Sequence, residues 1–463
     1  MLVKKTIYPS AISGSVPIPA SKSHTIRAIL IASMADGNST LRMPLESNDT
    51  IAAMRACRAL GARIDMQADR WIVTGTGGRL SPPATPIDVG NSGTTLYLLA
   101  GMAALADFPV QFTGDRQICR RSAGPLLAAL KDLGVEVESA AQGCAPFTVR
   151  GPLKGGSTSI ECPTSQYLSS LLLAAPLAAS DSRIEVPLLY ERPYVDMTLD
   201  WLDSQEISYR RSNYSSFSLP GGQHYRSFER RIPGDFSSAS FFMTAAAVTG
   251  SRLELNGLDM QDTQGDKEVV LLLEQMGCRV EQFDAGIVIE GPGADRPGGR
   301  QSGGGSAAGQ GLTGGGLAGG PGLSGGVFDL NNIPDALPAL SVAACFSRET
   351  VELRNVPQAR QKETDRIAVM HQELSKLGAD IEELEDGLII RGKGGLQGGS
   401  VSGHDDHRVI MALSIAALAA AGPVRIDDAA AAAVTFPDFY KHLEAIGGRV
   451  EIFEEPAAPR GAL

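Results

Sequence analysis

Residues 362–366, with the sequence KETDR, place two cations and two carboxylates within five positions of a chain in which only 20% of residues are charged. One interpretation is an exposed helix start, because Thr364 and Asp365 are common first-turn residues. Glu363 and Arg366 would then form an i,i+3 pair that contributes roughly 0.2–0.5 kcal/mol. The other interpretation is chemical, because cations can hold an anionic substrate and a carboxylate among them can transfer protons.

Two further clusters combine polar side chains with the predicted start of a helix. Residues 19–28 read PASKSHTIRA. Lys22 and Ser23 precede a helical run and Arg27 lies one turn later, an arrangement that suits an anion. Residues 88–101 (DVGNSGTTLYLLAG) contain a turn whose glycine would let a ligand approach the backbone amides. Ordinary helix capping and surface charge also explain both patterns, so both interpretations stay open here.

Two more segments carry residue types that recognise carboxylate or phosphate groups. Residues 114–126 (GDRQICRRSAGPL) are rich in arginine, which binds such groups in a bidentate manner. Residues 162–170 (CPTSQYLSS) place two hydroxyls and an amide before an apolar run. Solvated loop and cap residues are the alternative for both. The candidate side chains are Arg116, Arg120 and Arg121 in the first segment, and Thr164, Ser165 and Gln166 in the second.

The remaining candidates are acids and histidines at two further helix starts. Asp335 opens the apolar run 331–340 (NNIPDALPAL), where a carboxylate is also favoured simply by the helix dipole. Residues 404–409 read HDDHRV, so His404 and His407 flank two aspartates. A metal site is disfavoured, because three or four convergent ligands are needed and no other His or Cys cluster supplies them. A capped helix start is the alternative.

The composition limits the class of protein. The 463 residues are 43% apolar, which suffices for more than one core. The net charge of −11 argues against binding to nucleic acid or to an anionic membrane. The run LSSLLLAAPLAAS is too short for a membrane span, and the N-terminus does not have the pattern of a signal peptide. Six scattered cysteines indicate free thiols. We therefore expect a cytoplasmic protein.

An internal repeat predicts the architecture that must position these side chains. Helical patterns end in a glycine that is followed by an alternating strand, and a weaker copy occurs near Gln205. Without the glycine-rich segment 298–326, the period is about 70 residues, which indicates six units of a duplicated α/β domain. That segment itself should be a flexible loop. The glycines are Gly61, Gly134, Gly277, Gly378 and Gly447.

Taken in this order along nearly the whole chain, the motifs resemble those of the EPSP synthases (3-phosphoshikimate 1-carboxyvinyltransferases), which belong to the enolpyruvyl transferase family. NSGT, IPDA, KETDR and DHR in series are specific to them. In the UDP-N-acetylglucosamine branch of that family, a reactive cysteine stands where this chain has Arg116, and asparagine follows the lysine that matches Lys22. The resemblance is therefore to the EPSP synthase branch.

The resemblance implies an α/β, two-domain inverted α/β barrel with six βαβαββ repeats, three per domain. It implies a discontinuous domain of residues 1–21 plus 231–463 and an inserted domain of residues 22–230, with the active site in the cleft. The implied reaction moves the carboxyvinyl group of phosphoenolpyruvate onto the 5-hydroxyl of 3-phosphoshikimate and releases phosphate through a tetrahedral intermediate. No metal or other cofactor is expected, nor a nucleic-acid or membrane partner, and we expect a monomer.

The resemblance also assigns roles by position. The residues matched to 3-phosphoshikimate binding are Lys22, Ser23, Arg27, Thr164, Ser165, Gln166, Asp335 and Lys362. Those matched to phosphoenolpyruvate binding are Lys22, Asn91, Gly93, Arg121, Gln166, Arg366 and Arg408. The candidates for proton transfer are Lys22, Asp335, Glu363 and His407.

Four positions depart from the family pattern. Val434 replaces a lysine that contacts phosphoenolpyruvate, and Tyr97 replaces an arginine. Glu191 replaces a serine near the acceptor phosphate, where a carboxylate would be repulsive unless Arg192 or another cation paired with it. Ser122 replaces a proline. Two alternatives follow: an enolpyruvyl transferase with a different acceptor, suggested by Glu191, and a non-catalytic homologue, suggested by Val434.

Overall fold

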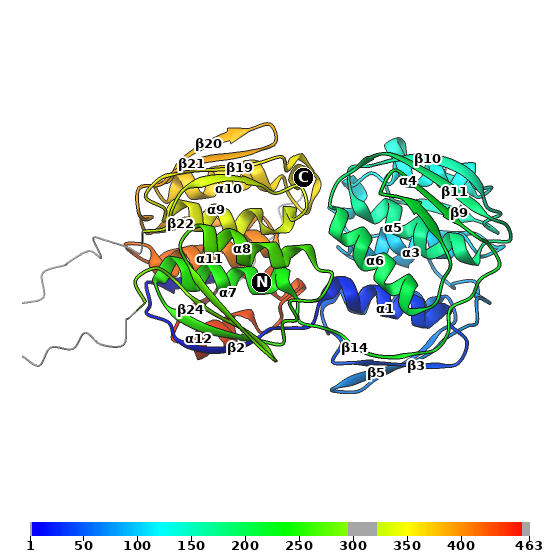
Figure 1. Ribbon diagram of the computed structural model, residues 1–463, viewed down its shortest axis with the longest axis horizontal. Coiled ribbons are helices and arrows are strands. Elements are labelled where there is room, and N and C mark those ends of the chain that lie inside the picture. Colours follow the sequence, from blue (N-terminus) through cyan, green and yellow to red (C-terminus); the bar gives the residue numbers. More distant parts are fainter. Residues whose placement is uncertain (1, 295–321, 456–463) are drawn as a thin grey trace, which may run out of the picture.

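The computed structural model describes residues 2–294 and 322–455, so most of the glycine-rich segment lies outside the described residues. Figure 1 shows two lobes side by side, with both marked chain ends in the same lobe. Their cores are separate. One comprises buried residues between 26 and 232, and the other comprises those in 7–18 and 236–446. We call the first the inserted lobe and the second the terminal lobe.

The helices of each lobe are of two kinds. Six of those described are buried over nearly their whole length: α1 (Lys22–Met34), α3 (Gly93–Ala103), α5 (Ser165–Ala174), α7 (Phe236–Thr249), α9 (Leu337–Cys345) and α11 (His407–Ala419). The others are amphipathic: α2 (Asn48–Ala59), α4 (Gly124–Asp132), α6 (Arg192–Ser204), α8 (Glu268–Gln275), α10 (Arg366–Lys376) and α12 (Phe439–Ala445). A helix that is apolar on every face must lie inside a core, whereas an amphipathic one covers it.

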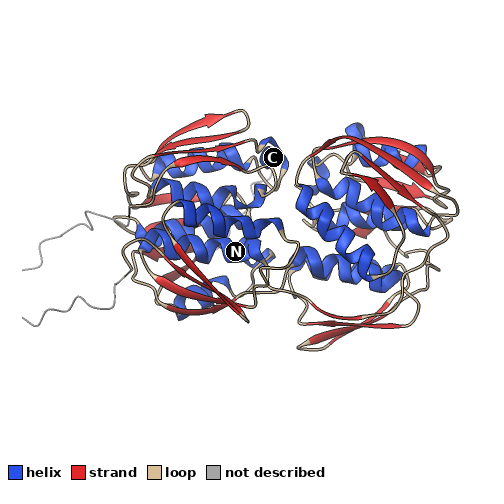
Figure 2. Ribbon diagram, viewed as in Figure 1, coloured by secondary structure: helices blue, strands red, loops and turns tan. Residues whose placement is uncertain are grey.

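The strands surround these helices, as Figure 2 shows. The inserted lobe has β3 (Asn38–Arg42), β4 (Arg63–Met66), β5 (Arg70–Thr74), β6 (Ile87–Asp88), β7 (Val110–Thr113), β8 (Glu136–Ser139), β9 (Phe147–Arg150), β10 (Gly156–Cys162), β11 (Ser182–Leu189), β12 (Arg210–Ser212), β13 (Ser216–Leu219) and β14 (Glu229–Arg231). The terminal lobe has β1 (Leu2–Tyr8), β2 (Gly14–Pro17), β15 (Arg252–Asn256), β16 (Arg279–Phe283), β17 (Gly286–Glu290), β18 (Gly326–Asp329), β19 (Thr350–Arg354), β20 (Asp380–Leu384), β21 (Gly387–Arg391), β22 (Gly399–Ser402), β23 (Val424–Asp427) and β24 (Arg449–Glu455).

The described strands form six four-stranded sheets of one design, in which one parallel pair is extended by two antiparallel strands. The inserted lobe contains β14-β3-β5-β4, β6-β7-β9-β8 and β10-β11-β13-β12. The terminal lobe contains β2-β15-β17-β16, β18-β19-β21-β20 and β22-β23-β1-β24. The α/β class predicted from the sequence is confirmed, and helices in the centre of each lobe with sheets outside are the inverted arrangement.

Three of these sheets are completed by strands from distant parts of the chain. β14, at the end of the inserted lobe, pairs with β3 near its beginning. β2 pairs with β15, more than 230 residues later, and β1 lies between β23 and β24. The other three sheets each come from one continuous segment in the order βαβαββ.

The glycines that predicted the repeat all adopt positive φ, from +87° at Gly378 to +109° at Gly61. At the weak copy, Glu206 takes this conformation instead, with φ 55°, and β12 starts four residues later. The alternating strands that follow these glycines differ in burial. Val137, Val280 and Ile381 are only partly buried, whereas Ile64 on β4, which is also an edge strand, is buried.

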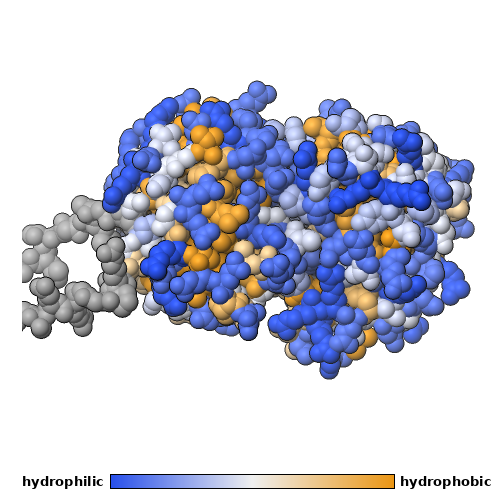
Figure 3. All heavy atoms as spheres, in the orientation of Figure 1, coloured by the Kyte–Doolittle hydropathy of each residue, from blue (hydrophilic) through white to orange (hydrophobic). Residues whose placement is uncertain are grey.

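Hydrophilic residues cover most of the face shown in Figure 3, on both lobes, in keeping with the net charge of −11. The described part of the chain contains no helix that is both long and apolar enough to cross a membrane. The six cysteines are free thiols, as predicted.

Candidate active site

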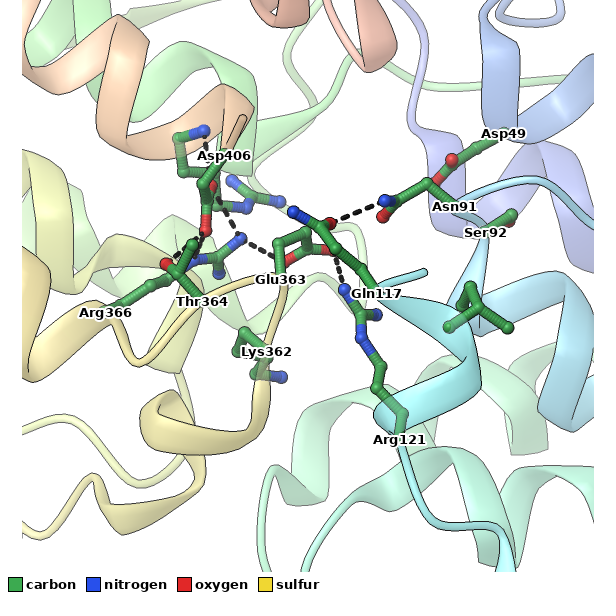
Figure 4. A network of polar contacts seen from close by, with 12 residues as sticks. Asp49, Asn91, Ser92, Gln117, Arg121, Lys362, Glu363, Thr364, Arg366 and Asp406 are labelled. Carbon is green, nitrogen blue, oxygen red and sulfur yellow. Dashed lines mark hydrogen bonds and ion pairs between the residues drawn. The ribbon is translucent and has the colours of Figure 1, made fainter. Parts of the chain in front are cut away.

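Most of the predicted site residues meet in one cavity between the lobes. Its narrow inner part is lined by Lys22, Ser23, Arg27, Gly93, Arg121, Ser165, Gln166, Asp335, Lys362, Glu363, Arg366, His407 and Arg408. A wider outer part, of about 570 Å³, includes Thr164 and shares Arg121, Gln166, Lys362 and Glu363 with the inner part. Asn91 lines neither part. Its amide donates to Asp115 at 2.6 Å. It also donates to Gln117 at 2.5 Å, and Figure 4 shows these two side chains beside each other.

Helix starts explain why these residues converge. Among the described helices, five begin with a residue that lines the inner cavity: Lys22 of α1, Gly93 of α3, Ser165 of α5, Arg366 of α10 and His407 of α11. The preceding residue is in each case a side-chain N-cap, namely Ser21, Ser92, Thr164, Asp365 and Asp406. The positive ends of five helix dipoles therefore point toward one space, which favours anions there.

Arg366 is the centre of the polar network. Its guanidinium donates to Asp335 at 2.8 Å, to Glu363 at 2.5 Å and to Asp406 at 2.8 Å. Burial acts to lower the pKa of Arg366, but these three carboxylates outweigh it and raise the pKa. The KETDR motif is thus not an exposed helix start. Only its last residue is helical, and Arg366 is fully buried.

Two carboxylates of the cavity are held in the ionised form. Burial alone would raise the pKa of Glu363, but Arg121 and Arg366 outweigh it and hold the pKa well below its usual range. Burial acts on Asp335 in the same way, and Arg408, Lys362 and Arg366 lower its pKa. Arg408 lies 2.8 Å from Asp335. Both groups are therefore unprotonated at neutral pH, as a proton acceptor must be.

Two ion pairs join the lobes across the cavity. Nη2 of Arg121, in the inserted lobe, lies 3.3 Å from Oε1 of Glu363 in the terminal lobe, and Figure 4 shows the two side chains pointing toward each other. Nζ of Lys362, in the terminal lobe, pairs with Oε1 of Glu191 in the inserted lobe. Residues that are far apart in sequence, and that belong to different lobes, are therefore held together at the cavity by opposite charges.

His407 is buried and uncharged at neutral pH. Burial lowers its pKa to about 3, although Glu363 and Asp406 act in the opposite direction. Within the described part of the chain, its Nε2 has no hydrogen-bond partner. His404, by contrast, lies 2.8 Å from Glu373 and does not line the cavity. Of the two histidines of the HDDHRV motif, only His407 thus belongs to the cavity.

Comparisons with known proteins agree with this geometry. The family model of EPSP synthase (3-phosphoshikimate 1-carboxyvinyltransferase) matches residues 7–443. The chain belongs to the EPSP synthase family. A relative named 3-phosphoshikimate 1-carboxyvinyltransferase from Acetivibrio thermocellus is 48% identical over 98% of this chain and 100% of its own length. One of the same name from Ruminiclostridium cellulolyticum is 45% identical over 96% and 99%. The solved structure of EPSP synthase from Acinetobacter baumannii has a TM-score of 0.78 at 27% identity, covering 98% and 100%.

The structure accounts for one EPSP synthase motif residue in steric terms. A Cβ atom on Gly93 would lie 2.7 Å from Nη1 of Arg121, so a side chain there would displace the guanidinium. Nε of Arg121 and its Nη2 donate no hydrogen bond to the described residues. Its Nε is therefore available to an anion in the cavity, whereas its Nη2 already faces the carboxylate of Glu363.

The residues that differ from the family pattern lie in different surroundings. Tyr97 lines the outer cavity, and its hydroxyl donates to the backbone oxygen of Ser122 at 3.1 Å. Val434 ends the short 3-10 helix η7 (Ala429–Val434) and is half-buried. Glu191 does pair with a cation, but the partner is Lys362, whereas Arg192 lies over the ring of Tyr214.

Sequence reasoning missed several polar residues around the site. Asp49, on α2, lies 3.2 Å from Nζ of Lys22 and lines the cavity. Tyr194 also lines it and donates to Asp266 at 2.7 Å. Burial raises the pKa of Asp266 to about 6, and Asp335 adds to the effect. Asp406 was also missed as a site residue. It lies in the DHR motif, which could have pointed to it, and it is a buried ion-pair partner of Arg366.

Proposed function

We propose that this chain transfers the carboxyvinyl group of phosphoenolpyruvate to the 5-hydroxyl of 3-phosphoshikimate, with release of phosphate. The observation that carries the proposal is a cavity in which two ionised carboxylates, Asp335 and Glu363, stand among cations from both lobes. Six cations and four carboxylates of the described residues line its inner part. This excess of positive charge, together with five helix starts, suits two anionic substrates.

The ionised carboxylates fit the proton transfers of this reaction. As the acceptor oxygen attacks C2 of phosphoenolpyruvate, Asp335 accepts the hydroxyl proton, and the methylene carbon gains a proton to become a methyl group. The tetrahedral intermediate then loses phosphate as Glu363 takes a proton from that methyl group. Both carboxylates act as bases, so the proton donated to the methylene carbon comes from Lys22. His407 lines the same cavity but is uncharged at neutral pH, so it has no proton to give in this step.

The cations divide between the two substrates in this proposal. Arg121, Arg366 and Arg408, with Lys22, hold the carboxylate and phosphate of phosphoenolpyruvate, and Gly93 leaves room for Arg121. Asn91 would have to turn from Asp115 and Gln117 to take part. The acceptor-binding set is Lys22, Ser23, Arg27, Thr164, Ser165, Gln166, Asp335 and Lys362.

The proposal includes two domains with the boundaries expected from the sequence, residues 22–230 inserted between 1–21 and 231–463. The separate cores support it. The proposal also takes the enzyme to be a monomer and places it in the cytoplasm.

The test is an assay of phosphate release with phosphoenolpyruvate and 3-phosphoshikimate, each alone and both together. Release that requires both substrates supports the proposal. Glu191 favours one alternative, an enolpyruvyl transferase with another acceptor. That enzyme would release no phosphate with 3-phosphoshikimate but would still bind phosphoenolpyruvate. Failure to bind either substrate would point to a non-catalytic homologue.

A further inference from the structure

Glu191 occupies an unusual place in the fold. It is the residue before α6 and has left-handed backbone angles, φ 59° and ψ 44°, which are uncommon for a residue with a side chain. Its side chain makes no capping hydrogen bond to α6. Instead, with 2% of its surface exposed, the side chain lies against the start of another helix, α5. Its local position in the sequence therefore does not explain its orientation.

The carboxylate of Glu191 fills a binding site built for an anion. Its Oε2 accepts three hydrogen bonds: from the backbone amide of Ser165 at 3.1 Å, from the Ser165 hydroxyl at 2.9 Å and from the Thr164 hydroxyl at 3.2 Å. Its Oε1 pairs with the ammonium group of Lys362. A helix N-terminus, two hydroxyls and a lysine are the donors that a phosphate group would use.

This site opens into the cavity of the proposed reaction. Ser165, Glu191 and Lys362 all line the inner cavity, and Gln166 beside them has a buried Oε1 atom with no partner among the described residues. Lys362 is also 4.0 Å from Asp335, the proposed base for the acceptor hydroxyl. A phosphate held by Lys362 would therefore belong to the molecule whose hydroxyl faces Asp335, which is the acceptor.

This inference rests on the proposed function. We propose that the carboxylate of Glu191 competes with the acceptor's phosphate group for the same binding site. The acceptor binds its phosphate at Thr164, Ser165 and Lys362 only by displacing this carboxylate. Glu191 thereby sets the affinity for phosphorylated acceptors without touching the reacting atoms. While the site is empty of acceptor, the same carboxylate neutralises Lys362 and links the two lobes.

The experiment measures binding by calorimetry of three probes: 3-phosphoshikimate, unphosphorylated shikimate and inorganic phosphate. The variants are Glu191→Gln, which removes the charge at similar volume, and Glu191→Asn, which also shortens the side chain and tolerates left-handed angles. We expect both variants to bind 3-phosphoshikimate and inorganic phosphate at least tenfold more tightly than the unaltered chain. In these variants the phosphate group can form charge-assisted hydrogen bonds at this site without first displacing a carboxylate. Binding of shikimate should change less than twofold.

The control is Glu185→Gln on β11, an exposed carboxylate of the same lobe with 44% of its side chain accessible, which should leave all three affinities unchanged. Unchanged or weaker binding of 3-phosphoshikimate in both folded variants, judged by their melting temperatures, overturns the inference. So does tighter binding of inorganic phosphate alone. Failure of the proposed function gives a different result: an unaltered chain that binds 3-phosphoshikimate but releases no phosphate from phosphoenolpyruvate.

Discussion

Nη2 of Arg121 lies 3.3 Å from Oε1 of Glu363, although the two residues belong to different lobes. After burial, Arg121 is the largest influence on the pKa of Glu363. The pKa of a proposed catalytic base therefore depends on the lobes being together. A lobe movement that separated the pair would change both the shape of the cavity and the basicity of Glu363.

Glu363→Gln should fold normally and lose turnover. The substitution keeps the volume but removes the group proposed to take the methyl proton, so we expect kcat to fall by about 10²–10⁴-fold. Steady-state phosphate release measures this change. The control is Glu382→Gln, an exposed carboxylate on β20. Full activity of Glu363→Gln would show that the KETDR motif has a structural role only.

Arg366→Met should strongly destabilise the protein. It leaves the fully buried Asp406, together with Asp335 and Glu363, without their shared cation, and breaking such a buried pair costs about 3–5 kcal/mol. Urea unfolding gives the change in the free energy of unfolding. Arg391→Met, which removes an exposed arginine that also pairs with two carboxylates, should cost far less. If Arg366→Met lowers the free energy of unfolding by as little as Arg391→Met does, the network around Arg366 adds no stability beyond that of an exposed ion pair.

His407 should make the fold acid-sensitive. Its pKa is about 3 in the folded state and about 6.5 when unfolded, so the unfolded chain takes up this proton first as the pH falls. The stability from neutral His407 is complete above pH 6.5 and is lost progressively toward pH 3. At pH 5 the loss is about 2 kcal/mol.

His407→Gln should remove this part of the pH dependence, seen as a flatter plot of unfolding free energy between pH 7 and 5. The matched control, His224→Gln, replaces an exposed histidine and should retain the slope of the unaltered chain. If the slope survives in His407→Gln, another group causes it.

Val434→Lys should tighten binding of phosphoenolpyruvate, and of glyphosate, which occupies the same site in the family that the chain resembles. Val434 ends η7, which packs against α2, the helix that carries Asp49. One added charge-assisted hydrogen bond is worth roughly 1.5–3 kcal/mol, or about ten- to a hundredfold in Kd.

Calorimetry with both ligands tests this prediction. Val327→Lys adds the same charge at a residue that is 67% exposed, so it controls for net charge. If Val434→Lys leaves both affinities at the level of this control, a cation from elsewhere in the chain already fills the place of the missing lysine.

The parts of the site that local sequence determines were predictable. Lys22, Gly93, Ser165, Arg366 and His407 each follow an N-cap residue, and capping chemistry can be recognised within a few positions. Their convergence could be inferred only from the family resemblance. The α/β class followed from glycines that end helices, whose positive φ is also a local requirement.

What could not be predicted depends on contacts between distant residues. Nothing near Glu191 in sequence indicates that its partner is Lys362, 171 positions later, in place of the adjacent Arg192. Asp49 joins the site because α2 packs beside α1 and α3. The edge strands differ in burial, since Ile64 on β4 is buried and Val280 on β16 only in part, and the alternation of residues alone does not specify this difference.

The position of β1 has a consequence for how the protein is made. Lys5 pairs with Ile426 on one side and Ile452 on the other, so the first strand has neither neighbour until almost the whole chain has left the ribosome. At synthesis rates of about 5–20 residues per second, that wait lasts roughly 20–90 s. The strands of the inserted lobe are complete once β14 has been synthesised, so this lobe can fold on the nascent chain while β1 still waits. β1 is therefore synthesised before the inserted lobe but takes its place in a sheet only after that lobe can have folded.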